Sequence, residues 1–423
     1  MERANDISRL LVEEVAVAHV EPVFAAIAEL ESSVDGVYLV GGAVRDVLLG
    51  AESFDLDIAV EGDAIGFARA LAHALGGRYT PHEKFGTAVV QYGDGSRVDV
   101  VTTRTERYHA PGALPTVEPA TIAEDLHRRD FTINAMAVSL KKADFGALVH
   151  PFGGRKDLEE GVIRVLHDLS FVDDPTRILR AVRYESRYGF RLEEHTERLA
   201  WECIARGLIA EVSPVRVRDE LLPLLEDSGA ARGIARLGEL GVDRALHPGL
   251  RGDADGAALY TRALDLRDEL GLEVPAWRIG LTVLARELTA EATFDWLDAL
   301  DVKHRDVDLI VGAVTFAPQI LVRLRAAPIT PADIVALAEP LAPDTPLLAI
   351  ALEDRSELRD YFTRLRCVEL EIGGAELAEL GLPESPRVGE LLAELQRRKL
   401  NGELDGRDSE LAAARELVRG EGS

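Results

Sequence analysis

The residue pattern of this 423-residue chain changes near residue 150. Before that point, short runs rich in β-branched residues alternate with glycine-containing turns; the runs are VYLV, LDIAV, TAVVQY, RVDVVTT and MAVSL. One helical segment, DAIGFARALAHAL, stands among them, with Asp63 placed to cap its start and Gly76-Gly77 to end it. After about residue 155, segments rich in leucine, alanine and arginine follow at helical spacing. The pattern predicts an α/β N-terminal head on a small sheet, followed by an all-α remainder.

The length of the chain predicts more than one hydrophobic core, because single cores stop growing at roughly 250–300 residues. We expect four parts: a head at residues 1–150 and helical segments at 151–225, 226–340 and 341–423. The N-terminal residues up to about 30 have apolar side chains near helical spacing, with Pro22 interrupting the helix.

The composition limits the functions that the chain can have. Its formal net charge is −26, so the average surface repels phosphate, and nucleic-acid binding requires a local basic surface. The arginine-rich stretch 164–191 is one candidate, although a solvated helix face with mixed charges explains it equally well. Cys203 and Cys367 are the only cysteines, which argues against a disulfide framework or a cysteine-based zinc site. With no run of about 18 apolar residues and no signal-peptide pattern, we expect a cytoplasmic protein without membrane contact.

The stretch LVGGAVRDVLLGAESFDLDIAV carries the first candidate site. A strand runs into Gly41-Gly42, where the backbone can approach a phosphate closely, and a short helix with Arg45 follows. Asp55 and Asp57 are separated by one residue on the next strand, so they share a face and repel each other unless a cation lies between them. Asp99, in another predicted strand, is a third carboxylate. Three acids on adjacent strands suit a two-metal displacement with hard divalent ions.

A second motif is LHRRDFTINAMAV, at residues 126–138. Arg128 and Arg129 could act as forks for phosphate groups, and Asn134 could hydrogen-bond a ribose hydroxyl. The alternative is a capped helix in which Asp130 bonds to its own first turn. That alternative gives no reason for two arginines to precede the acid.

The motifs GGAVRD…DLD, RRDFTINA and DDPTRILRAVRY, in this order, resemble those of the class II tRNA nucleotidyltransferase and bacterial poly(A) polymerase family. The resemblance covers about residues 35–225 and implies a polymerase-β-like nucleotidyltransferase head followed by a helical neck, body and tail, the tail binding tRNA. It implies that Asp55 and Asp57 bind Mg²⁺, with Asp99 the third catalytic acid. The implied nucleotide-binding residues outside the base template are Gly41, Gly42, Arg45, Arg129, Asp130 and Asn134.

The resembled family selects bases with a protein template, usually spelled E-D-x-x-R, which corresponds here to residues 173–177. Asp174 and Arg177 lie one helical turn apart and could present an acceptor and donors to the Watson–Crick edge of a base. Asp173 could orient the Arg177 guanidinium, but it is Asp where Glu is usual, which shortens its reach. Arg180, in the same motif, is a further nucleotide-binding candidate. Asp174 before a proline also suits a helix N-cap, and both roles can hold together.

A fourth stretch, SPVRVRDELL, resembles the later neck motif of the family, in which Arg216 and Glu220 match. An ordinary amphipathic helix capped by Ser213 explains the same residues equally well.

Residues 104–125 form a long proline-containing connection, a length typical of functional or disordered loops. In the resembled family this position carries a flexible loop that accommodates ATP, and enzymes adding only CMP lack it. Our first hypothesis is a metal-dependent enzyme that transfers AMP from ATP to the 3′-hydroxyl of tRNA and releases pyrophosphate, the A-adding subtype being favoured and CTP a second candidate substrate. Full CCA addition and poly(A) addition share the head motifs and stay open. Hypotheses from other classes are a small-molecule nucleotidyltransferase and an RNA-binding protein without catalysis.

Overall fold

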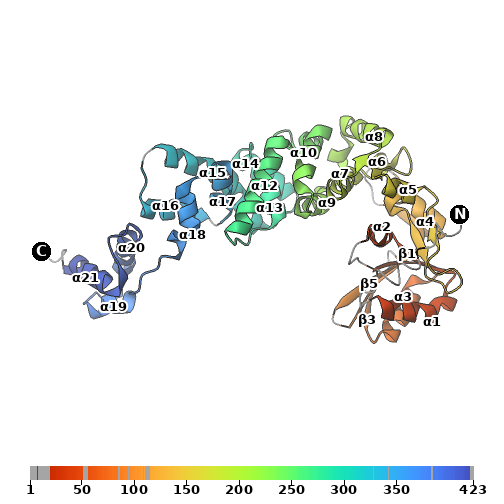
Figure 1. Cartoon of the computed structure of the whole chain (residues 1–423), viewed down its shortest axis with the longest axis horizontal. Helices are drawn as coiled ribbons and strands as arrows, with labels where there is room; N and C mark the ends of the chain where they lie inside the picture. The colour runs from red at the N-terminus through yellow and green to blue at the C-terminus, as the bar shows by residue number, and fades with distance from the viewer. Residues whose placement is uncertain are drawn as a thin grey trace. The chain divides into compact units, whose positions relative to one another are not determined.

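The computed structural model divides the chain into two compact units, Met1–Glu220 (unit 1) and Leu221–Ser423 (unit 2). It describes residues 7, 20–50, 56–83, 86–93, 95–107, 109, 115–326, 328–341, 343–382 and 384–419. Within these ranges unit 1 contains a mixed sheet with helices, and every element of unit 2 is a helix (Figure 1). The predicted fold class, an α/β head followed by a helical remainder, is confirmed.

The sheet of unit 1 has seven strands in the order β3-β4-β5-β2-β1-β8-β9. Their bounds are β1 (Gly36–Val40), β2 (Leu56–Glu61), β3 (Arg78–His82), β4 (Thr87–Tyr92), β5 (Ser96–Thr102), β8 (Ala137–Ser139) and β9 (Leu148–Val149). Among these described strands only the central β2 and β5 run parallel. The five β-rich runs of the sequence therefore form β1, β2, β4, β5 and β8, as predicted. The sequence did not predict β3 and β9.

Alternation along the central strands sets the two faces of the sheet. In β5, Val98 and Val100 are buried and alternate with Asp99 and Val101, which therefore point to the opposite face. On that opposite face a buried cluster joins the sheet to the chain that follows it; its members are Val40, Ala59, Ile122, Leu126, Ala135 and Ala137. The parallel register pairs Asp57 with Asp99, so both carboxylates belong to this second face.

Helices cover the sheet and lead out of it. The predicted helix is α3 (Ala64–Ala74), which packs against β2 to β5 and whose Asp63 cap accepts a hydrogen bond from the Gly66 amide (Figure 1). Helix α1 (Glu21–Leu30) packs on α3 and has Pro22 in its first turn. Proline is accepted there because the first amides of a helix have no intrahelical partner. The helix predicted before Pro22 falls on residues that, apart from Ile7, Val20 and Glu21, lie outside the described ranges.

The remaining elements of unit 1 follow in chain order. They are η3 (Glu31–Ser33), α2 (Gly42–Leu48), β6 (Arg104–Arg107), β7 (Thr116–Pro119), α4 (Ile122–His127), η5 (Thr132–Asn134), α5 (Gly154–Glu159), β10 (Val162–Ile163), α6 (Ser170–Asp173), α7 (Arg177–Tyr188), β11 (Arg191–Leu192), α8 (Glu194–Ala205), η6 (Leu208–Glu211) and α9 (Pro214–Glu226). The short parallel pair β10–β11 is a departure from the all-helical pattern predicted after residue 155.

The connection at residues 104–125 is more ordered than the sequence indicated. Its described residues form the antiparallel hairpin β6–β7 and the start of α4, where Thr121 and Glu124 make a capping box. Pro119 is the last residue of β7 and has no backbone N–H to donate. It does not prevent pairing, because the hairpin is a separate two-stranded sheet in which the outer edge of each strand has no partner strand. The sequence predicted a long connection here, and the structure shows paired strands and a capped helix start among its described residues.

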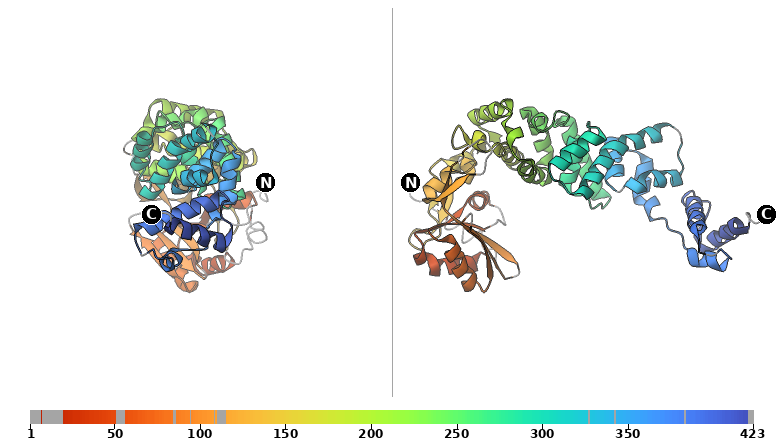
Figure 2. Two further views of the ribbon diagram at one scale, coloured as in Figure 1. Left: turned by 90° about the vertical axis from the view of Figure 1, so that its left-hand side faces the viewer. Right: turned by 180° about the vertical axis from the view of Figure 1, so that it is seen from behind.

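Unit 2 consists of helices over all of its described elements, as the views from two further sides also show (Figure 2). They are α10 (Ala230–Leu240), α11 (Val242–Leu246), α12 (Ala254–Glu269), α13 (Ala276–Leu284), α14 (Ala290–Ala299), α15 (His304–Ala326), α16 (Pro331–Ala338), η7 (Glu339–Leu341), α17 (Asp344–Leu352), α18 (Ser356–Thr363), η8 (Leu365–Cys367), α19 (Gly374–Glu379), α20 (Pro386–Leu400) and α21 (Gly406–Arg419). By length and composition α15 is apolar enough to cross a membrane, which the sequence analysis did not anticipate. Its apolar side chains pack against α13, α14 and α17, as in the core helix of a globular unit.

Candidate active site

A cavity of about 460 Å³ opens in unit 1, a size typical of small-molecule sites. It brings together residues that are far apart in the sequence: Gly41, Gly42, Arg45, Asp57, Glu106, Arg128, Arg129, Asp130, Asn134, Asp174, Arg177, Arg180, Tyr184 and Glu220. The three motifs of the sequence analysis thus share one cavity. Of the predicted site residues, Asp99 and Asp173 do not line it, and Asp55 lies outside the described residues.

The Gly-Gly turn at the end of β1 faces an arginine of the second motif. Gly41 has a φ of 67° and a ψ of −128°, a conformation that other residues rarely adopt. A β-carbon at this position would lie 2.7 Å from Nη1 of Arg129, too close for a real contact. Glycine is therefore required both for the turn and for the approach of the Arg129 guanidinium to the backbone.

A chain of hydrogen bonds ties the second motif to the first. Arg45, which is 5% exposed, donates from Nη1 to Oδ1 of Asn134 at 2.6 Å. The Asn134 amide in turn donates to Oδ1 of Asp130 at 3.0 Å. Because Asn134 is used on both sides, it holds Arg45 and Asp130 at a fixed spacing across the cavity wall. The capped-helix alternative is wrong, because the short turn Thr132–Asn134 has Phe131 as its N-cap and no side-chain cap; the backbone amide that the same Asp130 oxygen accepts is that of its neighbour Phe131, at 2.8 Å.

Arg180 from α7 completes the arrangement around Asp130. It donates from Nε to Oδ2 of Asp130 at 2.8 Å, from Nη2 to the Tyr184 hydroxyl at 2.8 Å, and from Nη1 to Glu220 at 3.3 Å. Burial raises the pKa of Asp130, but Arg180, Asn134 and Arg177 outweigh it, so that its pKa lies below the ordinary value. Asp130 is therefore an ionised carboxylate at neutral pH.

Tyr184 and Glu220 line the cavity but are not among the nucleotide-binding residues predicted from the sequence. The guanidinium carbons of Arg45 and Arg180 lie 5.1 Å and 5.4 Å from the Tyr184 ring centroid, within cation–π distance. Glu220 belongs to the SPVRVRDELL stretch, so that motif does reach the site. The signal for Tyr184 was its position one helical turn after Arg180, on the same face of α7.

The predicted base template has most of its polar groups engaged. Oδ1 of Asp174 accepts the Thr176 amide at 3.0 Å and hydroxyl at 2.6 Å, and Oδ2 lies 2.9 Å from Nη2 of Arg216. Arg177 donates from Nη1 to the Ser170 hydroxyl at 2.7 Å and from Nη2 to the Arg128 carbonyl at 2.9 Å. The N-cap itself is Thr176, with Asp174 closing the turn before it. Asp174 and Arg177 both line the cavity, and the base-reading role stays a prediction.

Asp173 points to a different neighbour. Its Oδ2 lies 4.0 Å from Nε2 of His167, whose ring stacks on that of His127 with centroids 5.7 Å apart. Burial, together with the Asp174 carboxylate, raises the pKa of Asp173, and His167 and Arg177 offset this only in part. Arg177 finds its described hydrogen-bond partners elsewhere, so the predicted orienting role of Asp173 is still a prediction.

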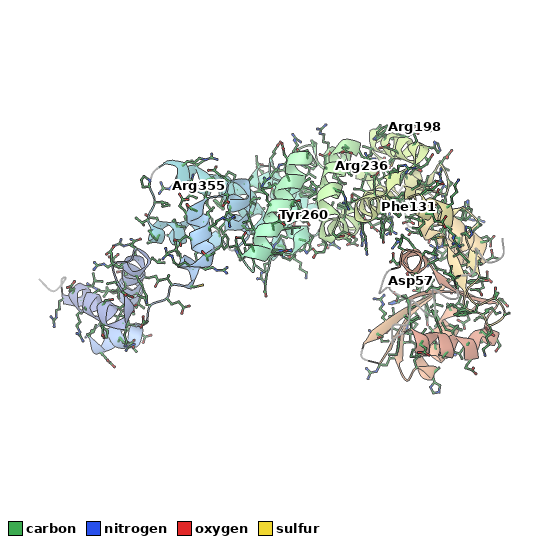
Figure 3. The ribbon with its side chains drawn as sticks, viewed as in Figure 1. Asp57, Phe131, Arg198, Arg236, Tyr260 and Arg355 are labelled. Atoms are coloured by element: carbon green, nitrogen blue, oxygen red, sulfur yellow. The ribbon has the colours of Figure 1, made fainter. Side chains whose placement is uncertain are left out.

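The acidic residues meet on the second face of the sheet. Asp57, labelled in Figure 3, lines the cavity at the start of β2, and its register partner on β5 is Asp99. Asp99 receives two hydrogen bonds from Arg97, from Nε at 2.9 Å and Nη2 at 2.7 Å. Within the described ranges no group of three His, Cys, Asp or Glu side chains is arranged to hold a metal ion, and Asp55 is not among those ranges. The predicted metal ligands therefore remain predictions.

A mixed sheet that carries paired aspartates beside a Gly-Gly turn and an arginine-lined cavity defines the class of nucleotidyltransferases. Residues 37–164 match the family model described as "Poly A polymerase head domain", and residues 189–252 match one described as "Probable RNA and SrmB- binding site of polymerase A". The chain belongs to the family of tRNA nucleotidyltransferases and poly(A) polymerases, whose members are generally metal-dependent.

Relatives within this family align along most of the chain. An A-adding tRNA nucleotidyltransferase of Geobacter sulfurreducens is 38% identical over 90% of this chain and 45% of its own length. An A-adding tRNA nucleotidyltransferase of Halalkalibacterium halodurans is 35% identical over 90% of this chain and 88% of its own length. The chain thus spans about half the length of the first relative. A Thermotoga maritima CCA-adding enzyme complexed with tRNA has a TM-score of 0.82 at 32% identity, over 98% of this chain and 99% of that one.

Proposed function

We propose that this chain is a cytoplasmic enzyme that transfers AMP from ATP to the 3′-hydroxyl of a tRNA ending in CC. The observation that carries the proposal is one cavity that the Gly41-Gly42 turn, the Arg129–Asn134 motif and the start of α7 line together with Asp57. Such a cavity combines phosphate-binding groups with an acidic residue at the place where phosphoryl transfer requires both.

The cavity offers distinct groups to each part of a nucleotide. Arg129, beside the Gly41 backbone, is suited to bind the triphosphate, because a guanidinium forks onto phosphate oxygens. Asn134 and Asp130 form a fixed polar pair that is suited to a ribose hydroxyl. Asp174 and Arg177 retain hydrogen-bonding capacity for a base, because each side chain has more acceptor sites or donors than its described contacts use. The reaction forms a bond between the 3′-oxygen of the RNA and the α-phosphorus and breaks the bond to pyrophosphate.

Mg²⁺ is the proposed cofactor, and the donor chemistry fits it. Asp57 and Asp99 are register partners on neighbouring parallel strands, so their oxygen donors share one face. Asp55, two residues before Asp57, is the proposed further ligand from the sequence pattern. When bound, the ion supplies positive charge that activates the 3′-hydroxyl and neutralises the phosphates.

One observation supports the A-adding subtype, and a second argues against an enzyme that adds only CMP. The relatives from Geobacter sulfurreducens and Halalkalibacterium halodurans carry that name. The hairpin β6–β7 lies at the position where the resembled family has its ATP-accommodating loop, and Glu106 of β6 lines the cavity. The Thermotoga maritima relative is named CCA-adding, so full CCA addition with CTP is the second candidate function.

Single-nucleotide extension of synthetic tRNAs tests the proposal. Three tRNAs ending at the discriminator base, after C and after CC are each incubated with ATP, CTP or both, with Mg²⁺, alongside an unstructured RNA. We expect incorporation of A only, and only into the tRNA ending in CC. Stepwise completion of CCA from the discriminator base would replace the A-adding subtype by the full activity. Long tails on the unstructured RNA would indicate a poly(A) polymerase, and no incorporation anywhere would favour a small-molecule nucleotidyltransferase.

A further inference from the structure

Asp125 is a fully buried carboxylate to which neither the sequence motifs nor the proposed reaction assigns a role. It lies in α4, three and four residues before the adjacent arginines 128 and 129, and its exposed fraction is 0%. An ionised carboxylate this deeply buried is costly unless all its acceptor sites are filled. Its surroundings therefore indicate what it holds in place.

Each carboxylate oxygen of Asp125 accepts hydrogen bonds from one of the two arginines. Oδ2 accepts from Nε and Nη2 of Arg129 at 3.2 Å and 2.9 Å. Oδ1 accepts from Nε and Nη2 of Arg128 at 2.9 Å and 2.7 Å. Both guanidinium groups thus bind Asp125 through their Nε and Nη2 atoms, and their Nη1 atoms point away from it. For Arg129 that remaining atom is the one beside Gly41 in the cavity.

The same carboxylate also reaches the hairpin. Oδ1 of Asp125 accepts the backbone amide of Arg104, the first residue of β6, at 3.1 Å. Arg128 donates from Nε to the Arg104 carbonyl at 3.1 Å and from Nη1 to Glu106 at 2.9 Å. The hairpin that carries Glu106 into the cavity is therefore fastened through Asp125 to the arginine pair. Burial raises the pKa of Asp125, but Arg129 and Arg128 outweigh it, so its pKa is lowered and the carboxylate stays charged.

We propose that Asp125 is a positioning residue for the triphosphate of the incoming nucleotide: it fixes Arg129 against the Gly41 turn and fastens the β6–β7 hairpin to the same support. The inference rests on the proposed function, because it takes Arg129 to be the phosphate-binding group. Asp125 itself touches no substrate in this scheme. It acts only through the two guanidinium groups that it orients.

The variant Asp125→Asn tests this with little change of volume. Its single carbonyl oxygen can serve only one arginine, and its amide faces the other as a donor. Loss of one charge-assisted hydrogen bond predicts about a tenfold rise in KM for ATP with a smaller change in kcat. Inhibition by inorganic tripolyphosphate should weaken by a similar factor, whereas inhibition by adenosine should not change.

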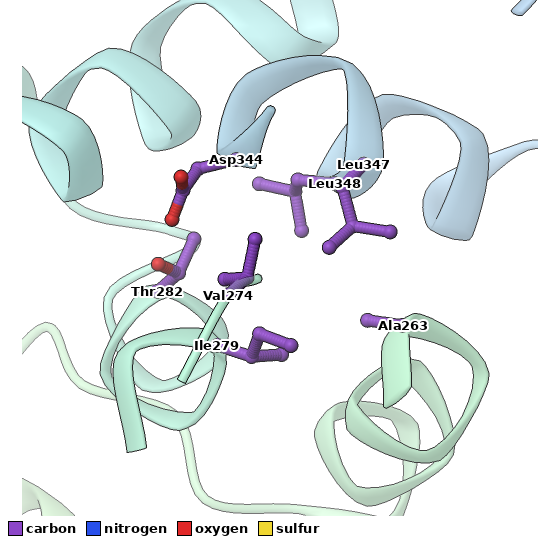
Figure 4. A pocket seen from close by; sticks show the side chains of 7 residues that line it. All are labelled: Ala263, Val274, Ile279, Thr282, Asp344, Leu347 and Leu348. Atoms are coloured by element: carbon purple, nitrogen blue, oxygen red, sulfur yellow. The ribbon is translucent and has the colours of Figure 1, made fainter. Parts of the chain in front are cut away.

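The matched control is Asp344→Asn in unit 2. Asp344 is also buried, at 6% exposure, and accepts two hydrogen bonds from one arginine, from Nε of Arg278 at 2.6 Å and Nη2 at 3.3 Å. It borders a small apolar cavity between helices, with Thr282 and Leu348 among its neighbours (Figure 4). This variant should lose thermal stability and keep the KM for ATP of the parent protein.

A double-mutant cycle separates positioning from a general loss of structure. If Asp125 acts through Arg129, the variant with both Asp125→Asn and Arg129→Ala has the same KM for ATP as Arg129→Ala alone. Additive effects, or an unchanged KM in Asp125→Asn, would overturn the inference. Should Asp125→Asn not fold, Glu106→Gln loosens the same network from the hairpin side, and it must raise the KM for ATP for the inference to stand.

Failure of the proposed function gives a different result. In that case the parent protein incorporates no nucleotide into any tRNA. Binding of tripolyphosphate, measured by calorimetry on the parent protein and on Asp125→Asn, then tests the positioning role alone. Equal affinities would refute it, and weaker binding by the variant would support it.

Discussion

Replacing Gly41 by alanine should damage the site far more than the fold. The added β-carbon lies 2.7 Å from Nη1 of Arg129, the far end of a flexible side chain, so the guanidinium moves and the backbone does not have to. The conformation of residue 41, with φ at 67°, adds about 1–3 kcal/mol of strain for any residue with a β-carbon. We therefore expect a protein that folds with a melting temperature lowered by several degrees.

The effect on activity follows from the displaced arginine. A charge-assisted hydrogen bond contributes about 1.5–3 kcal/mol, so its loss predicts about a 10- to 150-fold fall in kcat/KM for ATP. Steady-state incorporation of A into a tRNA ending in CC measures this, with thermal unfolding of the same preparation beside it.

Gly153→Ala is the matched control for the backbone contribution. Gly153 also has a positive φ, at 76°, but a β-carbon there meets nothing within 4 Å. It should lose about 1–2 kcal/mol of stability and keep its activity. If Gly41→Ala retained the kcat/KM of the parent protein, or if Gly153→Ala lost as much activity, the close approach of Arg129 to Gly41 would not contribute to activity.

Three further changes have defined outcomes. Asp57→Ala should abolish nucleotide incorporation while leaving the melting temperature within a few degrees, and retained turnover would remove Asp57 from the catalytic residues. The lowered pKa of Asp130 contributes stability that is fully present above the pKa of the unfolded chain, 3.8, and is lost as the pH falls through the pKa of the folded protein. Below about pH 4 the stability of Asp130→Asn should therefore fall less steeply with pH than that of the parent protein. Equal acid-denaturation profiles would contradict this. Asp63→Ala removes the α3 cap and should cost about 1 kcal/mol with no change in KM, as measured by urea unfolding.

The fold was largely predictable because its elements have strong local signals. In β5 the buried Val98 and Val100 alternate with Asp99, a spacing that predicts a strand, and Asp63 with Gly76 marks the two ends of α3. The residues 104–119 were harder, because their pairing is made within a separate two-stranded sheet that has no apolar alternation to announce it. The two-residue strands β9, β10 and β11 are too short to leave a pattern.

The site was predictable as a set of residue types but not as a set of contacts. Motif chemistry selected Arg45, Asn134 and Arg180, and all three line the cavity. It did not select Asp125, because a single acid in a short helix resembles ordinary surface charge until its 0% exposure is known.

By itself the sequence determined the central strands β1, β2, β4, β5 and β8, the helix α3, the helical character of the later chain, and which side chains could bind a phosphate, because periodicity and functional groups are local properties. The tertiary structure alone decided which hydrogen-bond partner each of those side chains has. Arg177 donates to the carbonyl of Arg128, and Arg180 donates to Asp130. Arg129 donates to the buried Asp125 and lies beside Gly41. These partners lie on different elements, and a guanidinium with five donors has many possible acceptors. Only packing, which fixes distances between segments, selects among them.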